Sequence, residues 1–387
     1  MNNIFTYVKG DKIIWAIVIL LSLLSILVVY SSIVTLAYKY KAGDTSYYLF
    51  KHSIIVGMGL LLMYLTHRIK FTYYSRLSQI ALFAAVPLLL FTLLKGANLN
   101  EASRWLEVPG TGLTFQTSDF AKLALIVYVA RMLAIKQNKI DDFKRTFLPI
   151  VIPVTIICGL ILPANLSTAL VLFTVCLIMM FIGRIPLKHL LVLIGSAITF
   201  FVLFVTLIFL LPRINNRVET WKSRIENFIH PDKENIQGHY QTDQAKIAIA
   251  TGGIIGKGPG KSTQRNFLPH PYSDFIYAII IEEYGLAMGV VIILLYLILL
   301  YRGINIATKS EKPFGSLLAI GCCLSLVFQA MINMAVAVNL FPVTGQPLPL
   351  VSMGGTSIWF TSITIGVILS VSRETEIEKN TVALGAA

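Results

Sequence analysis

One carboxylate, Asp274, lies where acid–base chemistry could use it. It closes the stretch Asn266-Phe-Leu-Pro-His-Pro-Tyr-Ser-Asp, in which Pro269 and Pro271 stiffen the chain before a long apolar run. Taken alone, this setting favours a helix N-cap, because Ser or Asp at a helix start accepts hydrogen bonds from free backbone N–H groups. The alternative is a general base that removes a proton from a substrate hydroxyl.

Other ionisable residues lie inside apolar runs, and four of them are candidates here: Asp119, Lys122, Glu282 and Glu283. Each is a candidate for a functional site, because a charged group in a membrane span costs about 3 kcal/mol. The two glutamates either bind substrate or pair with a basic side chain or a broken helix end. Lys122 is either a binding cation or the partner of an acidic neighbour in helix packing. We also expect it within ion-pair reach of Asp274, since each charge is costly alone.

Two segments rich in glycine and proline interrupt the apolar runs. Residues 252–263 resemble a phosphate-binding P-loop, but Ile255 stands where that pattern requires a glycine, so we reject an ATPase. Glycine amides beside Lys261 could still bind an anionic headgroup or a pyrophosphate; a flexible re-entrant turn is the alternative. Residues 339–357 hold three prolines and three glycines. Irregular backbone at membrane depth must be buried in protein or line a wet cavity.

The composition shows which elements must position these residues. The chain is 56% hydrophobic and 13% charged, with a mean hydropathy of +0.75, whereas soluble chains are about 25% charged. The bilayer is therefore the solvent, and the sequence predicts an all-α polytopic membrane protein. Runs near the required length of about 20 residues fall at 13–36, 47–66, 76–95, 118–136, 147–162, 165–183, 187–211, 275–300, 314–340 and 352–372.

Basic residues predict the orientation of these ten spans. With the N-terminus inside, the inner segments hold sixteen Lys and Arg, and the short outer segments hold only Lys39, Lys41 and Arg104. Cytoplasmic loops are enriched in Lys and Arg, so both termini should be cytoplasmic. The net charge of +13 is then explained by the basic cytoplasmic loops of a membrane protein and not by nucleic-acid binding. We expect one membrane domain, 1–380, with a large extracellular loop at 212–274 between spans seven and eight. Residues 381–387 are a tail or a cloning scar.

Four segments in order resemble the SEDS family (shape, elongation, division and sporulation), the membrane peptidoglycan glycosyltransferases. Residues 100–106 (NEASRWL) resemble its motif NGARRW, and residues 115–122 (FQTSDFAK) resemble QPSE-x-AK. Residues 267–285 (FLPHPYSDFIYAIIIEEYG) resemble LPEAHTDFIFAIIAEELG, and residues 342–357 (PVTGQPLPLVSMGGTS) resemble PTKGLTLPFISYGGSS. The resemblance covers essentially the whole chain. It is strongest to the division-associated branch, FtsW, with the elongation-associated RodA second.

The resemblance implies a site and a substrate. Asp274 matches the family's catalytic aspartate, which outweighs the N-cap interpretation, although one residue can serve both roles. The substrate would be lipid II, with Lys122 and Arg104 as counter-charges for its pyrophosphate and with Asp119, Glu282, Glu283 and Lys261 as further substrate-binding candidates. A divalent cation, Mg²⁺ or Mn²⁺, is implied, but the sequence shows no dedicated ligand cluster. No organic cofactor is implied.

The family also implies partners and a location. We expect a class B penicillin-binding protein and other division proteins as partners, and the division septum of a bacterial cytoplasmic membrane as the site of action. Two other functions are weighed against polymerisation: a lipid II flippase and a non-catalytic scaffold of the division complex. The charged residues cluster in the outer half of the chain, which argues against a translocation path, since such a path needs polar groups at both ends.

Several residues depart from the family's motifs. Thr117 and Asp119 replace the usual Pro and Glu of QPSE, so that carboxylate is shorter by one methylene. Asn165 replaces the acidic residue of a PDLGTA motif, which keeps hydrogen-bonding ability but removes a charge. Thr344 replaces a lysine that is common in division-type members, and Met353 replaces a tyrosine. None of these changes touches Asp274.

Overall fold

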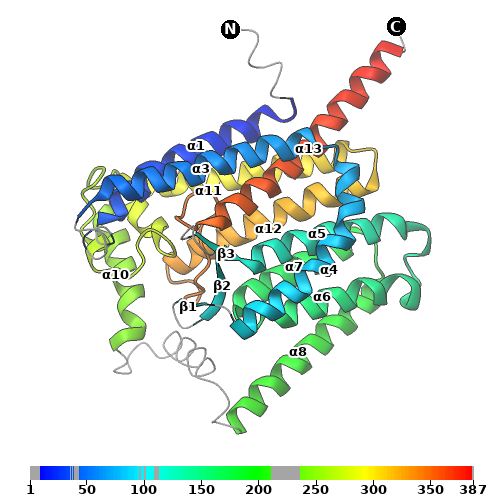
Figure 1. Cartoon of the computed structure of the whole chain (residues 1–387), viewed down its shortest axis with the longest axis horizontal. Coiled ribbons are helices and arrows are strands. Elements are labelled where there is room, and N and C mark those ends of the chain that lie inside the picture. The colour runs from blue at the N-terminus through cyan, green and yellow to red at the C-terminus, as the bar shows by residue number, and fades with distance from the viewer. Residues whose placement is uncertain are drawn as a thin grey trace.

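The computed structural model of the chain describes residues 9–34, 36, 38, 43–95, 97–99, 102–108, 113–210 and 236–385. These residues form a helical bundle with one small sheet (Figure 1). The helices are α1 (Lys12–Ser32), α3 (Thr45–Arg68), α4 (Phe71–Lys95), α5 (Thr117–Ile135), α6 (Leu148–Ile161), α7 (Leu166–Ile182), α8 (Leu187–Leu210), α10 (Ile236–Gly252), α11 (Ile276–Lys309), α12 (Pro313–Ala337) and α13 (Thr356–Gly385). The strands are β1 (Ala97–Leu99), β2 (Ala102–Val108) and β3 (Leu113–Gln116). Short turns of helix occupy Gln137–Lys139, Phe143–Phe147 and Gln264–Asn266.

The predicted all-α polytopic fold is confirmed. Each of the ten predicted spans falls on one of these helices, and α10 lies in the predicted outer loop. By length and composition, seven helices of the described residues could cross a membrane: α1, α3, α4, α6 with its leading turn, α11, α12 and α13. The apolar helix α7 and the segment Leu187–Leu203 of α8 are shorter. The count of ten spans therefore stays a prediction.

The two ends of the described chain lie on the same side of the bundle (Figure 1). The backbone N–H of Gly10 donates to Glu376 Oε2 on α13 over 3.1 Å. The next residue, Asp11, caps α1 and accepts from Arg302 Nε, near the end of α11, over 2.7 Å. The sheet and α10 lie at the opposite end. This arrangement agrees with termini on one face, and the assignment of that face to the cytoplasm stays a prediction.

A three-stranded antiparallel sheet, which the sequence analysis did not predict, connects α4 to α5. Its order is β1-β2-β3, and Trp105 pairs with Gln116 in the register of β2 and β3. Gln116 is also the N-cap residue of α5, and its backbone N–H donates to Thr356 Oγ1 at the start of α13 over 3.3 Å. The sheet therefore fixes where α5 begins, and with it the positions of Asp119 and Lys122 in the first turns.

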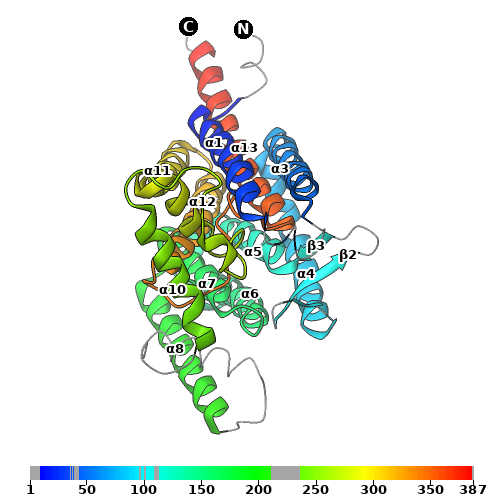
Figure 2. The same ribbon diagram turned by 90° about the vertical axis from the view of Figure 1, so that its left-hand side faces the viewer.

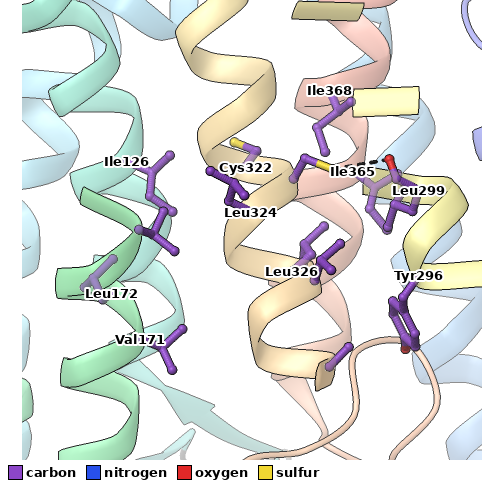
Figure 3. Close-up of a cluster of buried hydrophobic side chains, with 14 of the residues drawn as sticks. Ile126, Val171, Leu172, Tyr296, Leu299, Cys322, Leu324, Leu326, Ile365 and Ile368 are labelled. Atoms are coloured by element: carbon purple, nitrogen blue, oxygen red, sulfur yellow. Dashed lines mark hydrogen bonds between the residues drawn. The ribbon is translucent and has the colours of Figure 1, made fainter. Parts of the chain in front are cut away.

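Helix α12 lies in the middle of the bundle. In Figure 3 its side chains Cys322, Leu324 and Leu326 point to both sides, toward α5 and α7 on one and toward α11 and α13 on the other. These three residues are at most 8% exposed. Figure 2 agrees, with α12 between α11 on one side and α5 and α7 on the other, and with α8 at the margin of the bundle. Any polar side chain on α12 is therefore far from lipid and has to find its partners inside the protein.

Helices α6 and α7 form a hairpin, one of the two alternatives that the sequence left open. Proline and alanine turn the chain between them, and Asn165 caps α7 by accepting from the backbone N–H of Thr168 over 3.2 Å. The two helices pack on each other. The asparagine that replaces the family's acidic residue therefore has a local role at a helix start.

Helix α11 is broken at Gly285, whose φ of 81° and ψ of 172° are not helical. The turn after α10 closes this break. The backbone N–H groups of Leu286 and Ala287 donate to the carbonyls of Gly253 and Ile254 over 2.9 and 3.3 Å. The chains approach so closely that a Cβ on Gly285 would lie 2.0 Å from the Ile254 carbonyl oxygen. Only glycine fits both this backbone conformation and this contact.

We expect Gly285→Ala to destabilise the protein. A side chain at this φ and ψ, which essentially only glycine adopts, costs about 1–3 kcal/mol, and the contact with the Ile254 carbonyl adds to this cost. The measurement is the midpoint of thermal unfolding in detergent. Gly57→Ala on α3 is the matched control, because a Cβ there meets nothing within 4 Å. Equal midpoints for the two variants would contradict the close packing at the break.

Candidate active site

Asp274 lies in the irregular segment that leads into α11, and it is half-buried. The N-cap interpretation is wrong: the N-cap residue of α11 is Phe275, and no side chain caps this helix. The Asp274 carboxylate accepts one hydrogen bond among the described residues, from Ser273 Oγ to Oδ1 over 3.0 Å. It forms no ion pair with them. The carboxylate is therefore not tied to the helix start and retains capacity to accept a proton or a hydrogen bond.

The backbone on which Asp274 sits is held at three consecutive carbonyls. The Tyr272 carbonyl accepts from the backbone N–H of Met353 over 2.9 Å, and the Ser273 carbonyl accepts from Ser352 Oγ over 2.6 Å. The Asp274 carbonyl accepts from Asn333 Nδ2 over 3.0 Å. All three donors lie on α12 or on the segment before α13. The side chain of Asp274 thus projects from a rigid support.

Asn333 and Gln329 stand four residues apart on α12 and are 1% and 6% exposed. Asn333 Nδ2 also donates to the Gln346 carbonyl over 2.7 Å, and Gln329 Nε2 donates to the adjacent Pro347 carbonyl over 2.9 Å. Gln329 Oε1 accepts from Lys122 Nζ over 3.0 Å. These two amides connect α5, the proline-rich segment and the backbone of Asp274.

Lys122 and Asp274, which both lie in the described part of the chain, form no ion pair with each other. Lys122 Nζ lies 2.8 Å from Asp119 Oδ1, one turn earlier on α5, and its other partner is Gln329. The other interpretation, an ion pair with an acidic neighbour, is therefore the one that the structure shows. The physical reason is proximity along the helix: residues three apart lie side by side. Asp119 is 4% exposed, and its Oδ2 has no hydrogen bond among the described residues.

Glu282 binds the glycine-rich turn. Its carboxylate is fully buried and accepts from Lys257 Nζ over 2.6 Å and from the backbone N–H groups of Thr263 and Gln264 over 3.1 and 3.3 Å. The hydroxyls of Thr263 and Ser262 donate to it as well. This confirms one of the two structural alternatives, pairing with a basic side chain, which here is Lys257. A carboxylate so fully occupied has no free position for a substrate.

Glu283, next to it, is 1% exposed and accepts from the hydroxyl of Ser31 on α1. Arg265 Nη1 donates to the Ser31 carbonyl over 2.9 Å. The second carboxylate oxygen of Glu283, Oε2, has no hydrogen bond among the described residues. Glu283 therefore connects α11 to α1 behind the turn, so the structure gives it a structural position.

The glycine-rich turn is packed and is not free to wrap a phosphate. The backbone N–H groups of Lys257 and Gly258 donate to the carbonyls of Glu282 and Glu283, each over 2.9 Å. Lys257 is paired with Glu282. The backbone N–H of Lys261 donates to the Gly258 carbonyl over 3.2 Å, while its side chain is exposed and its ammonium forms no hydrogen bond or ion pair with the described residues. It stays a candidate for an anion at the surface, away from the contacts that hold Asp274.

Two further predictions concern Arg104 and a metal ion. The backbone of Arg104 lies in β2, but its side chain is outside the described residues, so its role stays a prediction. Within the part of the chain that the structure describes, no group of three His, Cys, Asp or Glu side chains could hold a metal ion. The Mg²⁺ or Mn²⁺ that the resemblance implies stays a prediction, and we assign no catalytic step to it.

Two of the departures from the family motifs line the same small cavity. Thr117 at the start of α5 and Asn165 at the start of α7 face it, together with Thr92 and Ser118. Thr92 Oγ1 donates to Thr117 Oγ1 over 3.0 Å. Thr117, which replaces the proline of QPSE, and Asn165, which replaces the acidic residue of PDLGTA, are therefore neighbours in space.

The sequence analysis missed three residues that hold the site: Gln329, Asn333 and Ser352. Two of them could have been found, because amides four residues apart inside an apolar run share one helix face and are costly in a membrane. Ser352 carried no such signal. Its role depends on where the segment before α13 lies, which only the fold shows.

Comparisons with known proteins agree with this geometry. The family model for FtsW, RodA and SpoVE, described as cell cycle protein, matches residues 11–377. The chain belongs to this family. Stage V sporulation protein E of Bacillus subtilis is 32% identical over 369 residues, covering 94% of this chain and 97% of the relative. A probable peptidoglycan glycosyltransferase FtsW of Geobacter metallireducens is 32% identical over 368 residues, covering 94% and 95%.

Solved structures share the fold. A chain of a peptidoglycan synthase complex, from work on the structural coordination of polymerization and crosslinking, superposes with a TM-score of 0.74 at 25% identity. The match covers 95% of this SEDS chain and 98% of that one. Thermus thermophilus RodA superposes with a TM-score of 0.67 at 24% identity over 95% and 97% of the two chains. The SEDS family and its fold are thus confirmed.

We expect Glu282→Gln to loosen the glycine-rich turn. The amide cannot balance the charge of Lys257, and its NH₂ group faces donors, so buried N–H groups lose an acceptor at about 1–3 kcal/mol each. The measurement is hydrogen exchange of the backbone amides of residues 257–264, which should speed up. Glu311→Gln, the same change at an exposed position, is the control. Unchanged exchange in the Glu282 variant would mean that the carboxylate does not hold the turn.

Proposed function

We propose that this chain is a peptidoglycan glycosyltransferase that polymerises lipid II on the outer face of the bacterial cytoplasmic membrane, with Asp274 as general base. The observation that carries the proposal is the setting of Asp274: a half-buried carboxylate on a backbone held at three consecutive carbonyls. Support also comes from relatives at about 30% identity that are named probable peptidoglycan glycosyltransferases. A general base at this position is worth about 10²–10⁴ in rate.

In this mechanism the Asp274 carboxylate takes the proton from the acceptor sugar's 4-hydroxyl. The oxygen forms a bond to the anomeric carbon of the donor, and the bond from that carbon to the phosphate oxygen breaks. The electron pair leaves with the prenyl pyrophosphate, whose charge then grows. Positive charge near the leaving group stabilises this transition state, and Lys122 is our candidate for it. Its ammonium would be shared between Asp119, Gln329 and the phosphate.

Arg104 and Lys261 are proposed as further contacts for the anionic substrate, Arg104 in the sheet beside α5 and Lys261 on the exposed turn. For Asp119 we propose an indirect role, which is to hold Lys122. Glu282 and Glu283 leave the set of substrate-binding residues, because their hydrogen bonds hold the glycine-rich turn and α1.

We further propose that the enzyme acts in cell division at the septum, with both termini cytoplasmic and a class B penicillin-binding protein and other division proteins as partners. The division role is supported by the FtsW names among the relatives. The partner is supported by the structural neighbour, a chain of a peptidoglycan synthase complex. A class B protein would supply crosslinking, for which this chain has no proposed residues.

We expect Asp274→Asn to lower the rate of lipid II polymerisation by about 10²–10⁴, because the amide cannot take the proton. The assay uses purified lipid II and the full chain, with and without its penicillin-binding protein, and separates the glycan strands on a gel. Asp243→Asn on the exposed face of α10 is the matched control for the loss of a carboxylate.

Three outcomes separate the alternatives. Polymerisation that persists in Asp274→Asn contradicts the assignment of the base. A wild-type protein that is inactive even with its partner supports a scaffold. Headgroup translocation in liposomes that survives the loss of Asp274, without polymerisation by the wild type, supports a flippase.

A further inference from the structure

Helix α12 carries two buried amide side chains, one of which binds the Lys122 ammonium and the other the backbone of Asp274. We call Gln329 and Asn333 the amide clamp. Toward one side, Gln329 Oε1 accepts from Lys122 Nζ over 3.0 Å. Toward the other, Asn333 Nδ2 donates to the Asp274 carbonyl over 3.0 Å. The clamp is thus a direct connection between the proposed cation and the backbone of the proposed base.

The clamp is also held at its centre. The two side chains donate to neighbouring carbonyls, those of Gln346 and Pro347, over 2.7 and 2.9 Å. The next residues of that segment are held too, since the Leu348 N–H donates to Ser352 Oγ over 2.8 Å and Tyr296 Oη donates to the Pro349 carbonyl over 2.5 Å. Side chains with partners on two sides and a fixed centre cannot shift without breaking several hydrogen bonds.

The position of the clamp suits a rigid spacer. Four residues of α-helix rise about 6 Å, so the two amides are offset by about one turn along α12. This helix is the most enclosed element of the bundle, with both flanks packed against other helices (Figure 3). A pair of amides in such a place is costly unless its polar atoms are satisfied. Gln329 Oε1, Gln329 Nε2 and Asn333 Nδ2 all have hydrogen-bond partners, while Asn333 Oδ1 has none among the described residues. Side chains that only held the proline-rich segment would need to bind no more than the carbonyls of Gln346 and Pro347, but Gln329 also binds Lys122.

We propose that Gln329 and Asn333 are positioning residues that set the distance between the Lys122 ammonium and Asp274. This proposal rests on the proposed function. The acceptor hydroxyl has to meet Asp274 while the donor's pyrophosphate meets the cation, so the separation of these two groups decides how well the reacting atoms align. Asn333 acts through the backbone of Asp274, and Gln329 acts through Lys122. Neither side chain is assigned a contact with substrate.

The two halves of the clamp should fail in different ways. Asn333→Leu, of similar volume, removes the hydrogen bond to the Asp274 carbonyl and should lower kcat by about 10- to 100-fold with KM within about threefold, the cost of a misplaced catalytic group. Gln329→Met, also of similar size, releases Lys122 and should raise KM for lipid II by about tenfold. The pyrophosphate is charged already in the bound substrate and gains further charge in the transition state, so this loss falls on KM as well as on kcat, whereas the Asn333 variant changes mainly kcat.

The experiment measures kcat and KM of both variants with lipid II and the full chain, beside the unfolding midpoint of each. Thr364→Ala on α13 is the control: its buried hydroxyl donates to the Phe360 carbonyl within its own helix over 2.7 Å. Asn333→Asp is a second variant of the same size that lacks the donor, in case the leucine variant does not fold. It should lower kcat in the same way.

A double variant distinguishes positioning from a general loss of structure. If Asn333 acts through Asp274, adding Asn333→Leu to Asp274→Asn should lower the residual single-turnover rate by less than about twofold, since groups that act as a unit are not additive. A further fall equal to that of the single variant, or equal effects on kcat and KM in the Asn333 and Gln329 variants, would overturn the proposal. Failure of the proposed function is a separate result: the wild type would then not polymerise lipid II, or Asp274→Asn would be fully active, whatever the clamp variants do.

Discussion

Backbone that leaves a helix inside a membrane protein has to find hydrogen-bond partners within the protein, because lipid offers none. Three irregular segments meet at one end of this bundle: the glycine-rich turn, the segment before α11 and the segment before α13. Each is closed by specific donors or acceptors from a neighbouring helix. Glu282 and the break at Gly285 hold the first, while Asn333 and Ser352 hold the other two to each other.

This constraint explains how the carboxylate of Asp274, the proposed general base, can be both fixed in position and available to a substrate. Hydrogen bonds to the carbonyls of residues 272–274 use main-chain acceptors and leave the side chain of Asp274 out of the network, apart from its contact with Ser273. Glu282 shows the opposite case: all of its acceptor capacity is used by the turn. Asp274 and Glu282, eight residues apart, thus differ in chemistry. The Glu282 carboxylate is used up by hydrogen bonds that hold the backbone of the turn, whereas the Asp274 carboxylate projects from a backbone that other groups hold.

The sequence predicted the helices well and the contacts between them poorly. Apolar runs of span length mark helices whatever their neighbours are, so all ten ranges fall on helices. The sheet beside α4 was missed, because its strands are short and their pairing depends on the turn geometry. Asp274 was found through a motif, yet the start of α11 was placed too early. Ser-Asp before an apolar run is a typical cap signal. Nothing in the local sequence shows that hydrogen bonds from α12 and from the segment before α13 hold this part of the chain outside the helix.

Lys122 shows why the partners of the buried charged side chains could not be predicted from the sequence. Its cost in the membrane correctly required a partner, but the sequence offered several carboxylates, and the nearest one along α5 is the one it uses. A neutral pair lowers the cost of burying the ammonium before substrate binds. Gln329 binds the same ammonium without charge, so in the proposed mechanism Lys122 can add a phosphate to its contacts with Asp119 and Gln329 and keep its place. An amide suits this task better than a second carboxylate, which would compete with the phosphate for the cation.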